Sequence, residues 1–194
     1  TRPDLAGMER AVADFLRCAG FFPEGHPLLS ETPSLVARAW AEEFLEGYRR
    51  APRDLLAERM AIDPARQGEI VALTNLQFVG VCPHHLLPYA GVAHVAYVPG
   101  RHLVGFGQIV QVVECLSRRF ALQEELAKTI AFELQTGLKA RGVAVMLEAQ
   151  QSCLALRGER QHGANAIAEA YAGSPAQQRD LRVRFSQVLA SRSR

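Results

Sequence analysis

The segment Cys82-Pro83-His84-His85 carries the residue types in this chain that are most able to do chemistry. Cysteine thiolates and histidine imidazoles are preferred protein ligands of Zn²⁺, and one further cysteine, Cys153, occurs much later in the sequence. Cys82, His85 and Cys153 would supply three ligands rather than four. Because three ligands leave one coordination position for water, this set favours a hydrolytic metal site over a purely structural one.

The two adjacent histidines are expected to have different roles. Cys82 and His85 are three positions apart and can converge on one ion, whereas His84 and His85 cannot both easily reach it from a tight turn. A free imidazole titrates near neutral pH, so His84 is a candidate general acid or base. The alternative interpretation is that Cys82 and Cys153 are ordinary buried thiols. The histidine pair beside Cys82 favours metal binding.

The composition is that of one ordinary globular domain. The chain has 194 residues, of which 48% are hydrophobic and 22% charged, and its formal net charge is +2. No block of basic residues precedes the arginine-rich tail, so nucleic acid is not an expected partner. No apolar run approaches the ~20 residues that cross a bilayer. The four cysteines lack the spacing of a disulfide framework and no secretory signal is evident, which predicts a cytoplasmic protein.

Residues 1–66 are predicted to form an N-terminal helical region. Two apolar stripes at helical spacing support this, and Thr32-Pro33 is typical of a helix start. The stripes consist of Met8, Val12, Phe15 and Leu16, and of Val36, Trp40, Phe44 and Leu45. Residues 51–67 are expected to be a connector with one short helix.

Residues 67–194 predict an α+β domain. Alternating apolar residues predict strands at 69–81, 91–99 and 143–149, and a short apolar run predicts a fourth at 153–156. Helical periodicity covers 107–120 and 122–140, so two helices should lie on one face of an antiparallel four-stranded sheet. The tail 179–194 is expected to form a short helix with Leu181 and Phe185 inward. Open sheet edges make pairing with neighbouring subunits plausible.

The sequence from Cys82 to Gly91 resembles the Cys-Glu-His-His-x-x-Pro-x-x-Gly segment of the GTP cyclohydrolase I family. The resemblance continues through Val-Ala-His-Val-Ala-Tyr-Val-Pro, which ends at Pro99, and it covers roughly residues 28–160 in order and spacing. Further matching segments are Glu31-Thr32-Pro33, Ser117-Arg118-Arg119 through Gln123-Glu124, and Glu148 through Cys153 to Arg157-Gly158. The resemblance implies the tunnelling fold, in which subunit sheets join into a barrel and active sites lie at subunit interfaces.

The resemblance also implies a role for each matching residue. Cys82, His85 and Cys153 correspond to the zinc ligands, although another divalent metal in the cell is an alternative. His84 would supply the proton that allows the imidazole ring of the purine to open. Glu124 corresponds to the carboxylate that accepts hydrogen bonds from the guanine edge.

Several residues correspond to substrate contacts. Arg157 matches a phosphate-binding arginine, and Arg38 stands where the family carries a lysine that reaches the neighbouring subunit's site. Gln123 and Gln108 are further candidate substrate contacts, and Gln151 occupies a catalytic position. The implied partners are a guanine nucleotide or related purine and other copies of this chain, because the family tends to form decamers.

The departures from the family pattern concern proton transfer and phosphate binding. Gln151 replaces a histidine, and glutamine cannot exchange a proton in neutral water. Gly107-Gln108 replaces a Ser-Lys pair, Gln111 replaces an arginine and Leu35 replaces a basic residue. These losses leave the apparatus for the first hydrolytic step in place.

Three hypotheses therefore remain open. The first is a GTP cyclohydrolase I that forms 7,8-dihydroneopterin triphosphate and formate. The second is a divergent hydrolase that opens the ring of a less phosphorylated purine or stops at the formamidopyrimidine. The third is a non-catalytic purine-binding paralogue, although a purely structural zinc site would have no use for His84.

Overall fold

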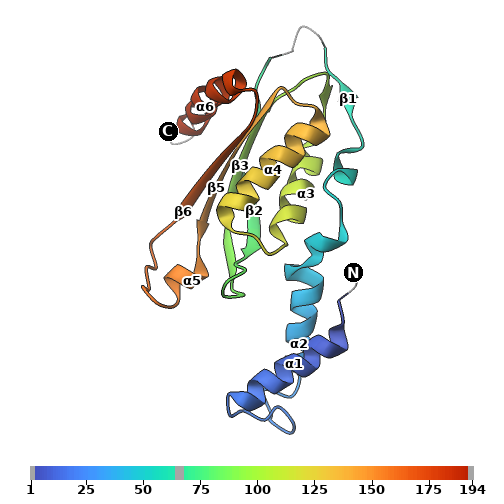
Figure 1. The fold of residues 1–194 in the computed structure, drawn as a ribbon, viewed down its shortest axis with the longest axis vertical. Coiled ribbons are helices and arrows are strands. Elements are labelled where there is room, and N and C mark those ends of the chain that lie inside the picture. Colours follow the sequence, from blue (N-terminus) through green and yellow to red (C-terminus); the bar gives the residue numbers. More distant parts are fainter. Residues whose placement is uncertain (1–2, 64–67, 192–194) are drawn as a thin grey trace.

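The computed structural model describes residues 3–63 and 68–191, and an antiparallel four-stranded sheet forms its centre (Figure 1). The strand order is β2-β3-β5-β6, and every neighbouring pair is antiparallel. The strands are β2 (Val71–Val81), β3 (Pro88–Val98), β5 (Gly142–Gln150) and β6 (Ala166–Gly173). The predicted α+β sheet is therefore confirmed, and three of its strands fall where the alternating pattern placed them.

Helices α3 (Phe106–Ser117) and α4 (Gln123–Leu138) cover one face of this sheet (Figure 1). Their apolar residues recur every three or four positions, so each helix presents one continuous stripe to the strands. The stripes and the facing sheet form the main core, which includes Ile109, Val113, Leu116, Leu126, Ile130, Leu134, Ala93, Val95 and Tyr97. This arrangement confirms the two helices expected on one face.

Helix α6 (Pro175–Ala190) lies on the opposite face of the sheet (Figure 1). Ser174 caps its N-terminus by accepting a hydrogen bond from the Gln177 backbone N–H, and Pro175 occupies the first turn. Leu181 and Phe185 are buried against the sheet, as predicted for the tail. None of the helices in the described ranges is long and apolar enough to cross a bilayer.

The prediction of a strand at residues 153–156 is wrong. Residues Ser152–Ala155 form the short helix α5, in which the Ala155 backbone N–H donates to the Gln151 carbonyl at 2.9 Å. An apolar run of four residues fits a strand and a helical turn equally well, so periodicity could not separate them. The fourth strand is β6, whose alanine-rich sequence has weak strand propensity and whose place is set by pairing with β5.

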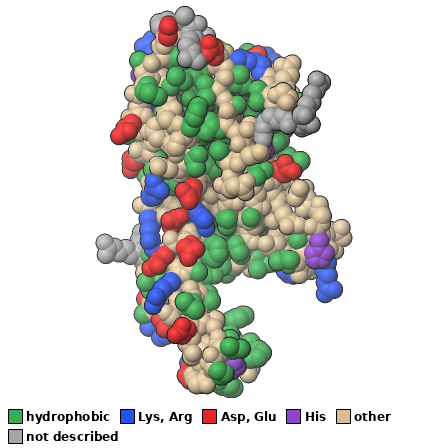
Figure 2. Space-filling view, turned by 180° about the vertical axis from the view of Figure 1, so that it is seen from behind, with side chains coloured by type: hydrophobic (Ala, Val, Ile, Leu, Met, Phe, Trp, Pro, Cys, Tyr) green, Lys and Arg blue, Asp and Glu red, His purple; other side chains and the backbone are tan. Residues whose placement is uncertain are grey.

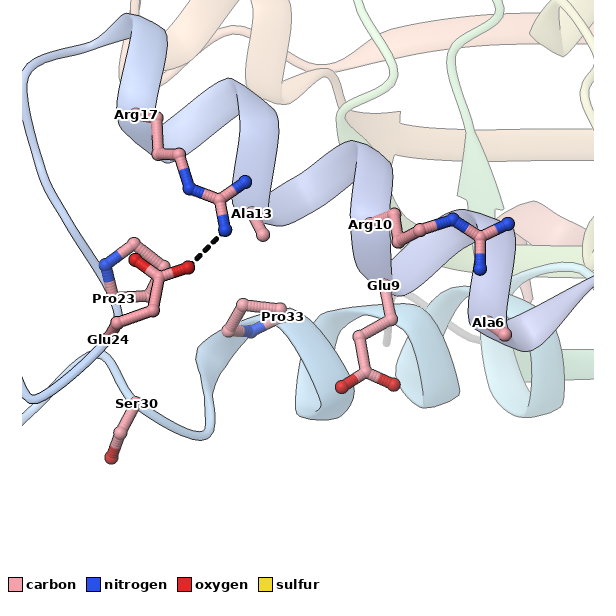
Figure 3. A pocket seen from close by; sticks show the side chains of 9 residues that line it. All are labelled: Ala6, Glu9, Arg10, Ala13, Arg17, Pro23, Glu24, Ser30 and Pro33. Atoms are coloured by element: carbon pink, nitrogen blue, oxygen red, sulfur yellow. Dashed lines mark hydrogen bonds and ion pairs between the residues drawn. The ribbon is translucent and has the colours of Figure 1, made fainter.

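The N-terminal region forms a helical hairpin that projects from the sheet domain (Figure 1). Helix α1 (Leu5–Cys18) packs beside α2 (Thr32–Arg38), and Figure 3 shows Arg17 of α1 paired with Glu24 in the connecting loop. The chain continues through a π-helical segment (Ala39–Phe44) and two 3-10 segments (Glu46–Arg49, Asp54–Leu56). Short strands β1 (Met60–Ala61) and β4 (His102–Leu103) then pair. The domain boundary placed between residues 66 and 67 lies outside the described residues.

Arg119 joins this N-terminal region to the helix layer. Its Nε donates to the Gly47 carbonyl at 3.0 Å, and its Nη2 donates to the Arg50 carbonyl at 2.8 Å. The Cys115 thiol on α3 lies 3.5 Å from the same Gly47 oxygen. The segment before the short strands is thereby fixed to the end of α3.

Gly91 makes the close approach of β3 and β5 possible. A Cβ at this position would lie 2.3 Å from the Glu148 carbonyl oxygen, so Gly91→Ala must push the two strands apart. We expect Gly91→Ala to lower the free energy of unfolding by about 1–3 kcal/mol in urea titrations. Gly163→Ala, where nothing lies within 4 Å of the added Cβ, is the control and should change little. Equal stabilities of the two variants would contradict this account of the strand pair.

Candidate metal centre

The turn between β2 and β3 brings Cys82 and His85 together. The turn is closed by two backbone hydrogen bonds of 3.0 Å, from Leu86 N–H to the Cys82 carbonyl and from Cys82 N–H to the Leu87 carbonyl. Leu86 adopts a left-handed conformation with φ of 52°, which reverses the chain within a few residues. As a result, the Cys82 Sγ and the His85 Nδ1 atoms lie 3.7 Å apart.

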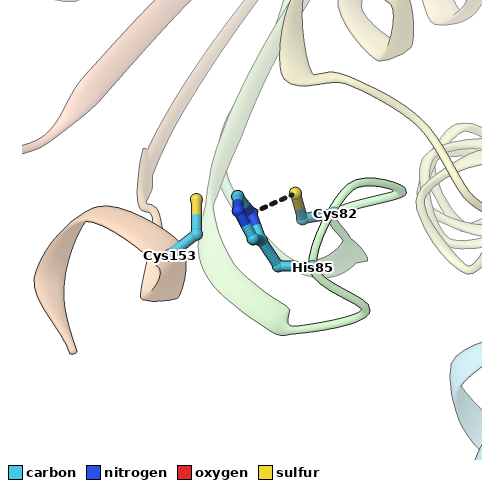
Figure 4. A group of neighbouring side chains, drawn as sticks. All are labelled: Cys82, His85 and Cys153. Atoms are coloured by element: carbon cyan, nitrogen blue, oxygen red, sulfur yellow. Dashed lines mark hydrogen bonds between the residues drawn. The ribbon is translucent and has the colours of Figure 1, made fainter. Parts of the chain in front are cut away.

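Pairing of β3 with β5 brings Cys153 to the same turn. Ala90 near the start of β3 is paired with Gln150 at the end of β5, and α5 follows directly. The Ser152 hydroxyl donates to the Pro88 carbonyl at 2.5 Å, which holds the start of α5 beside the turn. The donor atoms of Cys82, His85 and Cys153 all lie within 4.8 Å of one another (Figure 4).

These three side chains fit a zinc ion. Ligand distances of about 2.0–2.3 Å in a tetrahedral site place donor atoms about 3.5 Å apart, so small side-chain rotations suffice to close the site. Burial raises the pKa of the Cys153 thiol, and the nearby Cys82 thiol raises it further. Two neighbouring thiolates are unfavourable unless a cation neutralises them. Among the described residues, no fourth His, Cys, Asp or Glu joins the group.

A cavity of about 200 Å³ adjoins these ligands. It brings together residues from the β2–β3 turn, the start of α4, the N-terminal end of α5 and the first residue of β6. The lining residues are Cys82, His84, His85, Tyr89, Ala121, Leu122, Gln123, Glu124, Gln151, Cys153 and Ala166. His84 is exposed, and the planes of its ring and the His85 ring are 84° apart, so the two imidazoles face different directions.

Glu124 lies at the start of α4, where the helix meets the cavity. The Ala121 backbone N–H donates to the Val81 carbonyl at 3.3 Å, so the start of α4 is attached to the end of β2. Leu122, the N-cap residue, offers no capping side chain. The Glu124 carboxylate is exposed in the first turn of α4, beside backbone N–H groups that have no capping side chain.

The amides of Gln123 and Gln151 meet at the inner side of the cavity. Gln123 is only 5% exposed, and its Nε2 donates to the carbonyls of Leu147 and Ala166 at 3.0 and 2.9 Å. Its Oε1 accepts a hydrogen bond of 2.6 Å from the Gln151 Nε2. Both residues line the cavity, but every polar atom of the Gln123 side chain already has a protein partner.

Tyr89 lines the cavity and was not expected from the sequence. Its side chain is buried, and its hydroxyl has no hydrogen-bond partner among the described residues. Burial raises the pKa of this phenol, and the nearby Cys82 and Glu124 raise it further, so it stays protonated. The signal that could have found it is strand alternation, because Tyr89 and Ala93 share the buried face of β3.

The other predicted substrate contacts do not line this cavity. Arg157 is exposed just beyond α5, where its charge favours the Cys153 thiolate and lowers the pKa of that thiol slightly against the larger raising effects. Arg38 is exposed in the last turn of α2, in the projecting hairpin. The Gln108 side chain accepts from the Gly105 N–H and donates to the Leu55 carbonyl, both at 2.9 Å. Its amide is thus used within the fold.

The fold and the three-ligand site define an α+β protein with a candidate open metal centre. The family model for GTP cyclohydrolase I matches residues 8–190. The chain therefore belongs to the GTP cyclohydrolase I family, and the resemblance seen in the sequence is confirmed.

Curated relatives support the same family assignment. GTP cyclohydrolase 1 of Leifsonia xyli is 43% identical over 170 residues, which are 88% of this chain and 87% of that protein. GTP cyclohydrolase 1 of Brucella canis is 37% identical over 188 residues, which are 97% of this chain and 87% of that protein. An archaeosine synthase QueF-like structure covers 54% of this chain and 94% of its own, at 19% identity and a TM-score of 0.45. That distant similarity adds nothing to the assignment.

Removal of one thiol should strongly weaken metal binding. We expect the purified chain to bind one zinc ion, and Cys153→Ala to lose most of this affinity because two remaining ligands do not hold zinc tightly. Cys18→Ala is the matched control, since Cys18 is an exposed thiol on α1. Metal content after dialysis, measured by mass spectrometry, distinguishes the two variants. Stoichiometric zinc in Cys153→Ala would contradict the ligand assignment.

Proposed function

We propose that this chain hydrolyses the imidazole ring of GTP and forms 7,8-dihydroneopterin triphosphate and formate. The family assignment supports this reaction class. The observation that carries the proposal is that one cavity joins the Cys82, His85 and Cys153 ligand set to His84 and Glu124. A metal site, a proton donor and a base-recognition carboxylate are the groups that this hydrolysis requires.

In ring opening, the ligand set and His84 would have separate roles. Cys82, His85 and Cys153 would hold the zinc ion, which when bound supplies a water molecule made nucleophilic at neutral pH for attack on the purine C8. His84 is exposed in the same turn and lines the cavity. Its imidazolium can donate a proton to the ring nitrogen that leaves C8, so that the nitrogen departs as a neutral amine.

Guanine recognition is assigned to the start of α4. The Glu124 carboxylate can accept hydrogen bonds from both the N1–H and the 2-amino group of guanine, and adenine offers no such pair of donors. The first backbone N–H groups of α4 lack a side-chain cap and can donate to the O6 carbonyl of the base. The Glu124 carboxylate as acceptor and the neighbouring backbone N–H groups as donors together match the hydrogen-bonding pattern of the guanine edge.

A second candidate is a substrate with fewer phosphates than GTP. The observation that favours it is the Gln108 amide, whose hydrogen bonds to Gly105 and Leu55 leave it engaged within the fold. The cavity lining contains no lysine or arginine among the described residues, and Arg157 lies just outside it. A triphosphate requires several cationic contacts, so this site favours a smaller anionic group unless a neighbouring subunit completes it.

The projecting hairpin supports assembly into a homo-oligomer. Figure 2 shows hydrophobic side chains at the surface of the α1–α2 part, and Phe15, Phe22 and Leu28 are 70%, 65% and 83% exposed. Apolar surface of this kind favours burial against other copies of the chain. We propose that such assembly, decameric as in the family, brings Arg38 to a neighbouring site. Four cysteines without a disulfide are consistent with a reducing, cytoplasmic location.

Loss of His84 should separate catalysis from metal binding. We expect His84→Ala to lower kcat for formate release from GTP by about 10²–10⁴-fold, because the leaving nitrogen lacks its proton donor. Zinc content should not change. His162→Ala, at an exposed loop histidine, is the control and should keep full activity. Equal rates in the two variants would show that His84 takes no part in the reaction.

Substrate comparison should separate the two candidate functions. Zinc-loaded protein is incubated with GTP, GMP and guanosine, and formate and fluorescent pterin are measured. The main proposal predicts stoichiometric formate and pterin from GTP, with kcat/KM decreasing as phosphates are removed. Higher kcat/KM with GMP or guanosine, or formamidopyrimidine without pterin, would support the second candidate. Binding of all three without turnover would indicate a purine-binding paralogue.

A further inference from the structure

The buried amide of Gln123 has a fixed orientation. Its terminal nitrogen lies 3.0 Å from the Leu147 carbonyl and 2.9 Å from the Ala166 carbonyl. Both partners are acceptors, so only an NH₂ group, which carries two protons, can occupy this place. The opposite end of the amide is therefore the oxygen, and it can only accept.

The fixed orientation of the Gln123 amide also determines the orientation of the Gln151 amide. The atom that lies 2.6 Å from the Gln123 Oε1 must be a donor, so it is the Gln151 nitrogen. The Gln151 side-chain oxygen is thereby turned away from Gln123. Among the described residues, none donates a hydrogen bond to that oxygen. Gln151 lines the cavity two positions before Cys153.

We propose that Gln151 is a hydrogen-bond acceptor for the substrate and that Gln123 is a positioning residue that sets its polarity. The Gln151 oxygen accepts from an N–H or O–H group of the bound purine nucleotide. Because an amide cannot exchange protons at neutral pH, this contact orients the substrate and leaves proton transfer to His84. The inference rests on the proposed function for its substrate, whereas the polarity of the two amides rests on the hydrogen bonds alone.

The two glutamines should behave as one unit. Without Gln123, the Gln151 amide can rotate and present its NH₂ group in place of its oxygen. A donor facing a donor forms no hydrogen bond and leaves both groups unpaired. Loss of either glutamine should therefore remove the same substrate contact, and loss of both should cost little more than loss of one.

A double-mutant cycle tests this coupling. Gln123→Leu, Gln151→Leu and the double variant are compared in zinc-loaded protein for kcat/KM with GTP and for the Kd of 7-deaza-GTP, whose ring cannot be opened at N7. We expect each single variant to lose about five- to tenfold in kcat/KM and in affinity, and the double variant to lose no more than about tenfold. Gln135→Leu is the matched control, because Gln135 on the same helix also donates to a backbone carbonyl, that of Ala140 at 3.3 Å.

Stability distinguishes positioning from a merely structural role. Gln123→Leu leaves the Leu147 and Ala166 carbonyls unpaired and should lower Tm, so kinetics are measured well below that Tm. The proposal would be overturned if the loss of kcat/KM in the double variant equalled the product of the two single-variant losses. A Gln151→Leu variant with unchanged kcat/KM and Kd would also overturn it. Gln151→Leu alters only a partly exposed side chain, so it remains informative if Gln123→Leu does not fold.

Failure of the proposed function would give a different result. Wild-type protein that neither binds 7-deaza-GTP nor releases formate would overturn both the function and the substrate contact. NMR of the side-chain amides decides the polarity independently of any substrate. We expect both Nε2 protons of Gln123 to exchange slowly, and the one Gln151 Nε2 proton that is donated to Gln123 to lose protection in Gln123→Leu. Rapid exchange of the Gln123 protons in the wild type would contradict the fixed orientation.

Discussion

The candidate site depends on the convergence of three donor side chains from two segments that are far apart in the sequence. Cys82 and His85 come from one tight turn, and Cys153 comes from the start of α5. Two thiolates and a neutral imidazole at this distance are a donor set that favours binding of a divalent cation. The sheet keeps them close, because β3 joins the turn that follows β2 to the end of β5.

The cavity beside these donors is built by the same arrangement. Helix α4 is attached to the end of β2 through the bond from Ala121 to Val81, and Gln123 ties it to β5 and β6. Glu124 thereby stands near the ligand set with the positive end of the helix behind it. Glu124, His84 and the three candidate ligands all line this one cavity. The groups to which we assign base recognition and hydrolysis in the proposed function therefore lie around one small volume.

Much of this organisation could be predicted from the sequence. The strand pattern of residues 91–99 identified β3, whose residues pack on both faces of the sheet, and helical spacing identified α3 and α4. The α5 helix was mistaken for a strand because the run around Cys153 is too short to show a period. Strand β6 was missed because alanine has little preference for strands, and its position depends on pairing with β5.

Local patterns also set a limit to the prediction of the site. The spacing of Cys82 and His85 predicts that they meet, since a turn brings such residues together. No spacing predicts that the Gln108 amide donates a hydrogen bond to the Leu55 carbonyl, or that Gln123 orients the Gln151 amide. Both contacts join segments that are distant in the sequence. The sequence shows which residue stands at each position of the family pattern. Whether the polar atoms of that side chain are already hydrogen-bonded within the protein depends on the tertiary structure.

X-ray absorption at the zinc edge tests the central claim most directly. The account predicts a first shell of two sulfur atoms at about 2.3 Å, with one nitrogen and one oxygen at about 2.0–2.1 Å, the oxygen being exchangeable solvent. A shell completed by a fourth protein ligand, or one with fewer than two sulfur atoms, would contradict it.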